Sequence, residues 1–192
     1  FSMARRTQAV IMQAFMDLLT RKPLDKITVK DVIEEADINR NTFYYYYENI
    51  PALLDALFAQ EIRNFSESTE RSDSFVEEYR RLSAVVRNNR RAIYHIYQSE
   101  DRERISRYME TGAELFVERF VRKAAAPYGL SEEGIHYVTH FYSYAVVGLT
   151  MHRIRENIPT EDQNLAERIE GSFYASVDDV IQNYIQFSKE HP

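Results

Sequence analysis

The chain of 192 residues contains no cysteine, and it has only five glycines and five prolines. The missing thiols exclude disulfide bonds, thiolate nucleophiles and cysteine-ligated metal sites. So few glycines and prolines provide few of the turns that β-hairpins need, which predicts an all-α fold. No uncharged run approaches the roughly 18 residues of a membrane span, and no hydrophobic leader follows Met3, so we expect a cytoplasmic protein with no membrane contact.

Net positive charge is also lacking, because the formal net charge is −6. That total argues against a protein that coats nucleic acid non-specifically. The distribution along the chain is more informative. Residues 1–47 hold seven basic and six acidic side chains, a balance of +1, which leaves −7 for the remainder. The N-terminal segment is therefore compatible with a DNA contact, whereas the acidic character belongs to the C-terminal part.

Residues 28–47, TVKDVIEEADINRNTFYYYY, predict two short helices joined by a tight turn. Thr28 and Asp31 have the spacing of a capping box at the start of the first helix. Asn39 is a good N-cap for the second helix, and Asp37 lies in the short turn between the two. This order of elements is a helix-turn-helix, whose second helix can lie in the major groove of DNA.

The second helix ends in five consecutive aromatic residues, Phe43–Tyr47. Successive helical positions turn by about 100°, so the five rings cannot all face one core. The i, i+4 spacing of Phe43 and Tyr47 lets these two share the inner face. The outer positions are then Arg40, Asn41, Thr42, Tyr44, Tyr45 and Tyr46. Such side chains can contact base edges and phosphates, so this face predicts a DNA-binding surface.

The stretch ITVKDVIEEADINRNTFYYYYENIPALLDAL resembles the DNA-binding domain of the tetracycline-repressor (TetR/AcrR) family of one-component bacterial transcription regulators. The resemblance covers about residues 4–65 closely and the rest only in helical layout and length. It implies backbone contacts to DNA from Thr28 and Lys30, base and phosphate contacts from the outer face of the second helix, and core positions for Phe43 and Tyr47. The predicted DNA-contacting residues are Arg5, Arg6, Thr28, Lys30, Asn39, Arg40, Asn41, Thr42, Tyr44, Tyr45 and Tyr46.

Arg5 and Arg6 come before the apolar stripe of a first helix expected over 4–21. They either reach phosphates or a minor groove as an arm, or form a solvated helix start.

The sequence departs from the family pattern at the turn and after the second helix. Asp37 stands where the family usually has a glycine, and it can adopt a left-handed conformation at some cost. Glu48 and Ile50 occupy the region where the family often has a lysine that grips a phosphate. We therefore expect Arg40 and the aromatic cluster to supply more of the grip on DNA than is common in the family.

The polar, serine-rich stretch 66–74 marks the expected domain boundary. We predict a helix-turn-helix DNA-binding domain over 3–48, a connecting helix over 49–66, and a helical ligand-binding and dimerisation domain over 67–192. Further helices are expected at about 75–88, 89–98, 102–126 and 131–157, followed by one closing helix. The fold class is then an N-terminal three-helix head plus a C-terminal helical bundle, with about nine helices in all.

The two closing helices carry excess apolar surface, including 11 uncharged residues from Phe141 to Met151. Such surface predicts a four-helix contact with the same pair of helices from a second chain, and the resemblance implies the same homodimer. Intrachain core is the alternative for part of each stripe. The predicted interface residues are Val146, Gly148, Leu149, Phe173, Val177 and Ile181.

Aromatic residues also concentrate in the middle of the chain, which suits an apolar or aromatic effector. Plain core packing is the alternative interpretation. The predicted ligand-binding residues are Tyr94, Tyr97, Tyr108, Phe116, Phe120, Tyr137, Phe141 and Tyr144.

These features predict a DNA-binding transcriptional regulator, specifically a ligand-responsive repressor that binds a palindromic operator as a homodimer. Its partners would be double-stranded DNA, a second copy of itself and an unknown small-molecule effector, and it would need no cofactor. Glu48, Ile50 and the acidic total favour one alternative, a helical dimer that binds a ligand or a protein but has lost operator binding.

A metal-dependent enzyme is the third alternative, because His136 and His140 stand at i, i+4. No H-E-x-x-H motif and no third ligand at a recognised spacing accompany them. We therefore predict no metal site and no enzymatic activity.

Overall fold

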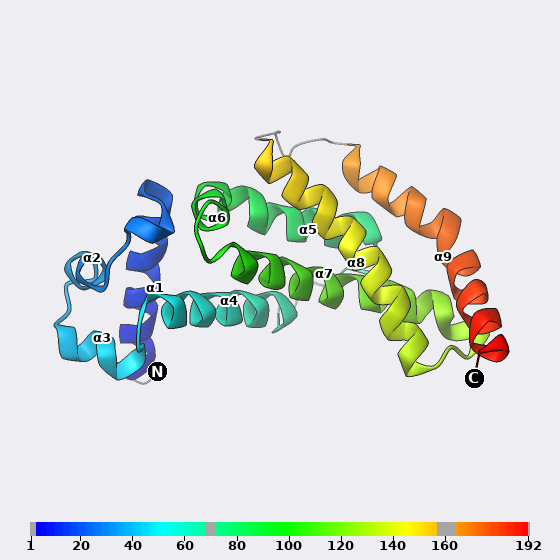
Figure 1. The fold of residues 1–192 in the computed structure, drawn as a ribbon, viewed down its shortest axis with the longest axis horizontal. Helices are drawn as coiled ribbons and strands as arrows, with labels where there is room; N and C mark the ends of the chain where they lie inside the picture. The colour runs from blue at the N-terminus through cyan, green and yellow to red at the C-terminus, as the bar shows by residue number, and fades with distance from the viewer. Residues whose placement is uncertain (1–2, 68–71, 157–163, 192) are drawn as a thin grey trace. The chain divides into compact units, whose positions relative to one another are not determined.

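The computed structural model describes residues 3–67, 72–156 and 164–191. Within these ranges the chain forms nine α-helices, two short 3₁₀ helices and no β-strand, which confirms the predicted all-α fold (Figure 1). The chain divides into two compact units, the first comprising Phe1–Glu67 with Asn88–Tyr108 and the second Ser68–Arg87 with Met109–Pro192. None of the described helices has the length and apolar character that crossing a membrane requires.

The first unit is built around the N-terminal helix. Its elements are α1 (Met3–Arg21), a 3₁₀ turn (Leu24–Lys26), α2 (Val29–Glu35), α3 (Arg40–Tyr46), α4 (Ile50–Glu67), α6 (Arg90–Tyr97) and the start of α7 (Arg102–Ala125). α1 packs against both α2 and α6, and α2 packs against α3. Ile11, Phe15 and Leu19 are fully buried at i, i+4 and i+8 on α1, so one apolar stripe of this helix holds its neighbours together.

Specific contacts join residues 88–108 to the helices at the start of the chain. Nδ1 of His95 lies 2.6 Å from the backbone carbonyl of Leu19, which can only accept, so the imidazole donates. The ring of Tyr108 stacks on Phe58 with centroids 4.5 Å apart, and burial raises the pKa of its phenol. Residues 88–108 therefore belong to the first compact unit although they follow the predicted boundary at 66–74, of which residues 68–71 lie outside the described part.

The second unit has an aromatic core. It contains α5 (Phe75–Asn88), most of α7, a 3₁₀ turn (Ala126–Tyr128), α8 (Glu132–Arg155) and α9 (Leu165–Glu190), and α8 packs against α9. Phe75 lies at the centre of this core, with ring centroids 4.8 Å from Phe116, 5.0 Å from Phe120 and 5.2 Å from Phe173. These helices match the predicted segments to within a few residues.

The cap and turn signals read from the sequence are confirmed around α2 and α3. Asn39 accepts the Thr42 amide at 2.8 Å and thereby caps α3. Asp37 has a φ of +50°, and it is the only non-glycine residue with a positive φ in the described ranges. Its amide donates to the Glu34 carbonyl and the next amide donates to the Ile33 carbonyl, which is the pattern that ends a helix in a left-handed residue.

Thr28 and Asp31 form the capping box at the start of α2. The Thr28 amide and hydroxyl both donate to the Asp31 carboxylate at 2.7 Å, and the Asp31 amide donates back to the hydroxyl at 3.2 Å. Lys22 lies 2.9 Å from the other carboxylate oxygen. The hydrogen bonds from Thr28, followed by Lys22, lower the pKa of Asp31 to about 2.

This lowered pKa predicts a pH-dependent contribution to stability. Asp31→Asn is expected to lower the free energy of unfolding by about 1 kcal/mol at neutral pH, because it weakens the cap and removes the charge. A depressed carboxylate pKa stabilises the fold above its ordinary value near 3.8, and this contribution is lost as the pH falls toward 2. Urea titrations from pH 7 down to pH 2 should therefore show the gap between the two proteins closing below pH 4. The exposed Asp179→Asn should show no such gap, and a pH-independent gap for Asp31→Asn would contradict the prediction.

Candidate nucleic-acid interface

α3 divides its aromatic residues between the core and the surface. Phe43 is completely buried and Tyr47, directly after the helix, is 5% exposed. Their ring centroids lie 6.0 Å apart. The Tyr47 hydroxyl has no hydrogen-bond partner in the described part of the chain, and burial raises its pKa. The inner face of α3 thus consists of the two residues that the helical spacing assigned to it.

The outer face of α3 presents polar and aromatic side chains together. Tyr45 is 81% exposed and Tyr44 is 45% exposed, whereas Tyr46 is half-buried. The rings of Tyr45 and Tyr46 meet edge to face with centroids 4.9 Å apart. Each ring is supported by a neighbour, so this surface is partly fixed before any partner binds, which lowers the conformational entropy lost on binding.

Arg40 adds a positive charge to this surface, and no acidic side chain in the described part of the chain neutralises it. It is exposed and forms no ion pair among the described residues, and its guanidinium lies over the Tyr44 ring at 5.4 Å from the centroid. The neighbouring cations are already paired, Lys22 with Asp31 at 2.9 Å and Lys30 with Glu34 at 3.6 Å. Compared with Lys22 and Lys30, Arg40 is therefore the basic side chain best placed to attract a phosphate or a guanine edge.

Several other predicted DNA-contacting residues use their side chains locally. The hydroxyl of Thr28 belongs to the capping box, and the hydroxyl of Thr42 donates to Asn39 at 3.1 Å. Lys30 and Asn41 are exposed. Arg5 and Arg6 are exposed within the first turns of α1, so the structure places them on a helix rather than on an extended arm. After α3, Asn49 caps α4 by accepting the Ala52 amide at 2.8 Å.

The predicted effector residues are not gathered around one cavity in the described chain. Tyr94 and Tyr97 lie on α6, where Tyr94 is 40% exposed. Tyr108 stacks on Phe58 in the same unit, whereas Phe116 and Phe120 are buried in the aromatic core around Phe75. Tyr137, Phe141 and Tyr144 are each more than half exposed on α8. The set divides into core residues and surface residues.

The predicted dimer residues divide in a similar way. Val146, Phe173, Val177 and Ile181 are at most 3% exposed, so their side chains fill the core of the second unit. Leu149 is 44% exposed, and a side chain added at Gly148 would meet no atom within 4 Å. The exposed apolar surface of α8 instead centres on Tyr137, Phe141 and Tyr144, which sequence reasoning had assigned to a ligand.

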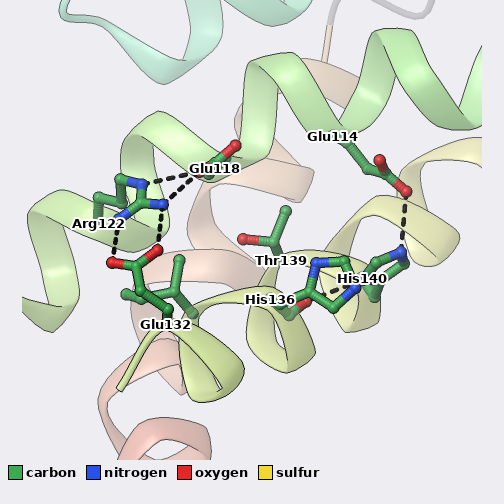
Figure 2. Close-up of a pocket in the computed structure, with 8 residues that line it drawn as sticks. Glu114, Glu118, Arg122, Glu132, His136, Thr139 and His140 are labelled. Carbon is green, nitrogen blue, oxygen red and sulfur yellow. Dashed lines mark hydrogen bonds and ion pairs between the residues drawn. The ribbon is translucent and has the colours of Figure 1, made fainter. Parts of the chain in front are cut away.

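His136 and His140, the candidate metal ligands, lie beside a polar pocket between α7 and α8 (Figure 2). Their ring centroids are 4.0 Å apart, and Nε2 of His140 lies 3.0 Å from a Glu114 oxygen. Among the described residues, no three histidine or acidic side chains are grouped closely enough to hold a metal ion.

Four further residues that line this pocket were not predicted from the sequence: Glu118, Arg122, Glu132 and Thr139. The signal that was available was the i, i+4 spacing of the acidic and basic residues on α7.

Two family models together match most of the chain. Residues 11–57 match the model described as bacterial regulatory proteins, tetR family, and residues 73–175 match a transcriptional regulator C-terminal region. Over 55 residues the chain is 38% identical to the HTH-type dhaKLM operon transcriptional activator DhaS of Lactococcus lactis subsp. lactis (strain IL1403). That match covers 29% of this chain and only 29% of the relative.

Solved structures share the fold over most of the chain. The dihydroxyacetone kinase operon activator DhaS has a TM-score of 0.71 at 20% identity, covering 89% of this chain and 96% of that one. A putative TetR-family transcriptional regulator from Rhodococcus sp. has a TM-score of 0.58 at 19% identity, covering 92% and 99%. MexZ, a repressor responsible for antibiotic resistance in Pseudomonas aeruginosa, has a TM-score of 0.53 at 16% identity, covering 92% and 95%.

Proposed function

Because the chain belongs to the tetR family of bacterial regulatory proteins and is thus a DNA-binding transcriptional regulator, we propose that it acts as a ligand-responsive repressor. In this proposal two copies bind a palindromic operator, each inserting α3 into a major groove. The observation that carries the proposal is the division of α3, with Phe43 and Tyr47 buried and Arg40, Tyr44 and Tyr45 exposed.

The exposed residues on α3 have the chemistry that an operator contact requires. A guanidinium without an ion pair can bind guanine bidentately, and Asn41 can bind adenine in the same way. Tyrosine rings cover sugar and base edges while their hydroxyls donate to phosphates. Thr28 and Lys30 would add contacts to the DNA backbone from the start of α2. Glu48 stands where a phosphate-binding lysine is common in the family, so Arg40 and the tyrosines have to supply more of the affinity.

The exposed apolar face of α8 supports assembly into a homodimer. Tyr137, Phe141 and Tyr144 are 53%, 53% and 54% exposed, and with Gly148 they follow one another at spacings of three or four residues. Exposed aromatic residues in one contiguous row mark interaction sites. In a two-fold dimer this row would contact the same row of the second chain, and Gly148 would allow the helices to approach closely.

An effector would act through its different affinity for two states of the dimer. In one of these states the two reading heads are misplaced for the operator. A ligand that binds this state more tightly lowers operator affinity, and the size of the effect is set by the difference between its binding free energies for the two states. The aromatic residues of the chain suit an apolar or aromatic effector as one candidate class.

The operator itself can be tested with the DNA directly upstream of the protein's gene. Fluorescence anisotropy of labelled duplexes should show saturable binding that resists competitor DNA and weakens steeply with salt. A duplex that is preferred over random sequence, with two protein chains per duplex, is the expected result. If no duplex is preferred over competitor, the alternative of a helical dimer without operator binding replaces this proposal.

Substitution of Tyr45 tests the proposed operator contact most directly in that assay. Tyr45→Ala is expected to weaken operator binding by about tenfold, because an exposed ring and its hydroxyl are lost from the centre of the contact. Tyr45→Phe separates the two contributions, since it removes only the hydroxyl. Phe187→Ala is the matched control, because Phe187 is also an exposed aromatic residue, 62% accessible, but lies on α9. Equal operator affinities for Tyr45→Ala and Phe187→Ala would exclude the proposed role of Tyr45.

The sign of regulation is a separate question, because the Lactococcus lactis relative is a transcriptional activator. A promoter fusion downstream of the identified operator should show higher expression when the gene for this chain is deleted if the protein represses. Lower expression after deletion would assign it as an activator.

A further inference from the structure

The pocket between α7 and α8 has a volume of about 150 Å³ and polar walls. Three glutamates line it, Glu114 and Glu118 from α7 and Glu132 from α8, together with Arg122, Thr139 and His140. None of these residues was assigned to DNA, to the dimer or to the aromatic effector site. All of them belong to the second compact unit.

Arg122, the one guanidinium among the described residues that line the pocket, is already paired with carboxylates. Arg122 donates to both oxygens of Glu132, at 2.9 and 2.8 Å, and to Glu118 at 2.7 Å. These hydrogen bonds raise the pKa of Arg122 and lower the pKa of Glu132. An anionic ligand would therefore find no unpaired basic side chain in Arg122, whereas a cationic ligand would meet carboxylate oxygens.

The net charge of the pocket stays negative when His140 is included. Its Nδ1 lies 3.0 Å from the His136 carbonyl and must donate, while its Nε2 faces a Glu114 oxygen at 3.0 Å. The ring makes both contacts favourably when it carries two protons, and it then contributes one positive charge. Three carboxylates still outnumber Arg122 and His140, so the pocket is negative in either protonation state.

Thr139 supplies a second observation that is independent of the acidic residues. It is only 4% exposed, it lines the pocket, and its hydroxyl has no hydrogen-bond partner in the described chain. Figure 2 shows it between the Arg122 ion pairs on one side and the His140–Glu114 pair on the other. Buried hydroxyls normally have a partner, so this one indicates a place where a ligand donor or acceptor completes the site.

We propose that this pocket binds a small organic cation that carries a primary ammonium group. Such a group has three N–H donors, and the pocket offers three acceptors in the Glu114 carboxylate, the Glu118 carboxylate and the Thr139 hydroxyl. Glu114 and Glu118 are one helical turn apart on the same face of α7. A cavity of about this volume holds a ligand of about six heavy atoms. A metal ion fits less well, because no metal-binding group of three ligands is present among the described residues.

The first experiment uses the unmodified full-length protein and requires no DNA. Calorimetric titration with 1,4-diaminobutane is expected to show saturable binding of one molecule per chain. 1,4-Butanediol has a similar shape without charge, and tetramethylammonium has one of the two charges of the diamine without N–H donors, so both should bind at least about tenfold more weakly. Equal binding of the diol, or no saturation by the diamine in the millimolar range, would overturn the proposal.

Variants then locate the binding in this pocket. Glu114→Gln and Glu118→Gln should each weaken diamine binding by about tenfold, because a charged hydrogen bond is lost while the shape is kept. Thr139→Val removes only the hydroxyl and should weaken binding several-fold. Glu133→Gln is the matched control, since Glu133 is exposed on α8 and does not line the pocket. Unchanged binding in the two α7 variants would overturn the assignment, as would stoichiometric zinc binding that excludes the diamine and is lost in His136→Ala.

Discussion

Replacing Phe43 with alanine is expected to lower the free energy of unfolding by about 3–5 kcal/mol. The ring is completely buried, with Tyr44 against it edge to face at 5.5 Å and Tyr47 at 6.0 Å. Truncation removes this packing and leaves a cavity that the short helix α3 cannot readily fill, because Asn39 caps its start and Tyr47 is buried directly after its end. Operator binding should then be lost together with the structure of the head. Urea unfolding followed by circular dichroism measures the stability.

Tyr45→Ala is the internal control for this result. Its side chain is 81% exposed two residues further along the same helix, so its loss should change the free energy of unfolding by no more than about 0.5 kcal/mol. The pair of variants thus separates stability from binding, since Phe43→Ala is expected to destabilise the head and Tyr45→Ala to weaken only the operator contact. A loss below about 1 kcal/mol for Phe43→Ala would contradict the assignment of Phe43 to the core of the head.

Phe141→Arg is expected to dissociate the proposed dimer and to lower operator affinity by more than about 100-fold. Phe141 lies at the centre of the exposed row on α8. In a two-fold interface the substitution would place two arginines, one from each chain, in apolar surroundings. Separated chains would bind the two half-sites independently, so the gain from linking two reading heads would vanish. Light scattering reports the oligomeric state and anisotropy reports operator affinity.

Leu115→Arg is the matched control for the dimer experiment. Leu115 is an exposed apolar residue of the same unit, 38% accessible, but it lies on α7 rather than on the proposed face. It should leave both the mass and the operator affinity unchanged. If Phe141→Arg remains a dimer with unchanged operator affinity, the dimer contact must be assigned to another surface.

Local signals in the sequence were sufficient to predict the head. Thr28 and Asn39 cap the two helices through hydrogen bonds to amides three residues on, so a short stretch contains all the partners involved. The division of the FYYYY run followed from helical geometry alone, because Phe43 and Tyr47 are one turn apart. Helix boundaries were similarly accessible, since the helices expected at 89–98 and 102–126 begin and end within a few residues of the ends that the structure shows at Asn89 and Gly129.

Periodicity could not say which side of an apolar helix lies inward. The run from Phe141 to Met151 is uncharged, so its composition did not show that Phe141, predicted to bind a ligand, would face outward and that Val146, predicted to lie in the interface, would face inward. In the structure Val146 is 3% exposed and Phe141 is 53% exposed, because contacts from α9 and the aromatic core select one face. That selection depends on residues distant in sequence, such as Phe173 against Tyr142 at 4.8 Å.

The polar pocket was still less accessible to sequence reasoning. Arg122 and Glu132 come from different helices, and only the turn between them brings the two groups within 2.9 Å. Thr139 looks like an ordinary helical threonine until its burial and its lack of a partner in the described chain are known.

The left-handed backbone of Asp37 restricts the sequences that this head can accept. An L-residue there costs roughly 1–2 kcal/mol, and only asparagine, aspartate and glycine adopt the conformation readily. The angle at which α3 leaves α2 depends on this one residue, because its amide and the next close the end of α2. Position 37 therefore tolerates few substitutions although its side chain is exposed, whereas the exposed Asp25 is free of that restriction. In a library of random variants, position 37 should be depleted of changes other than asparagine and glycine, although less strongly than the buried position 43.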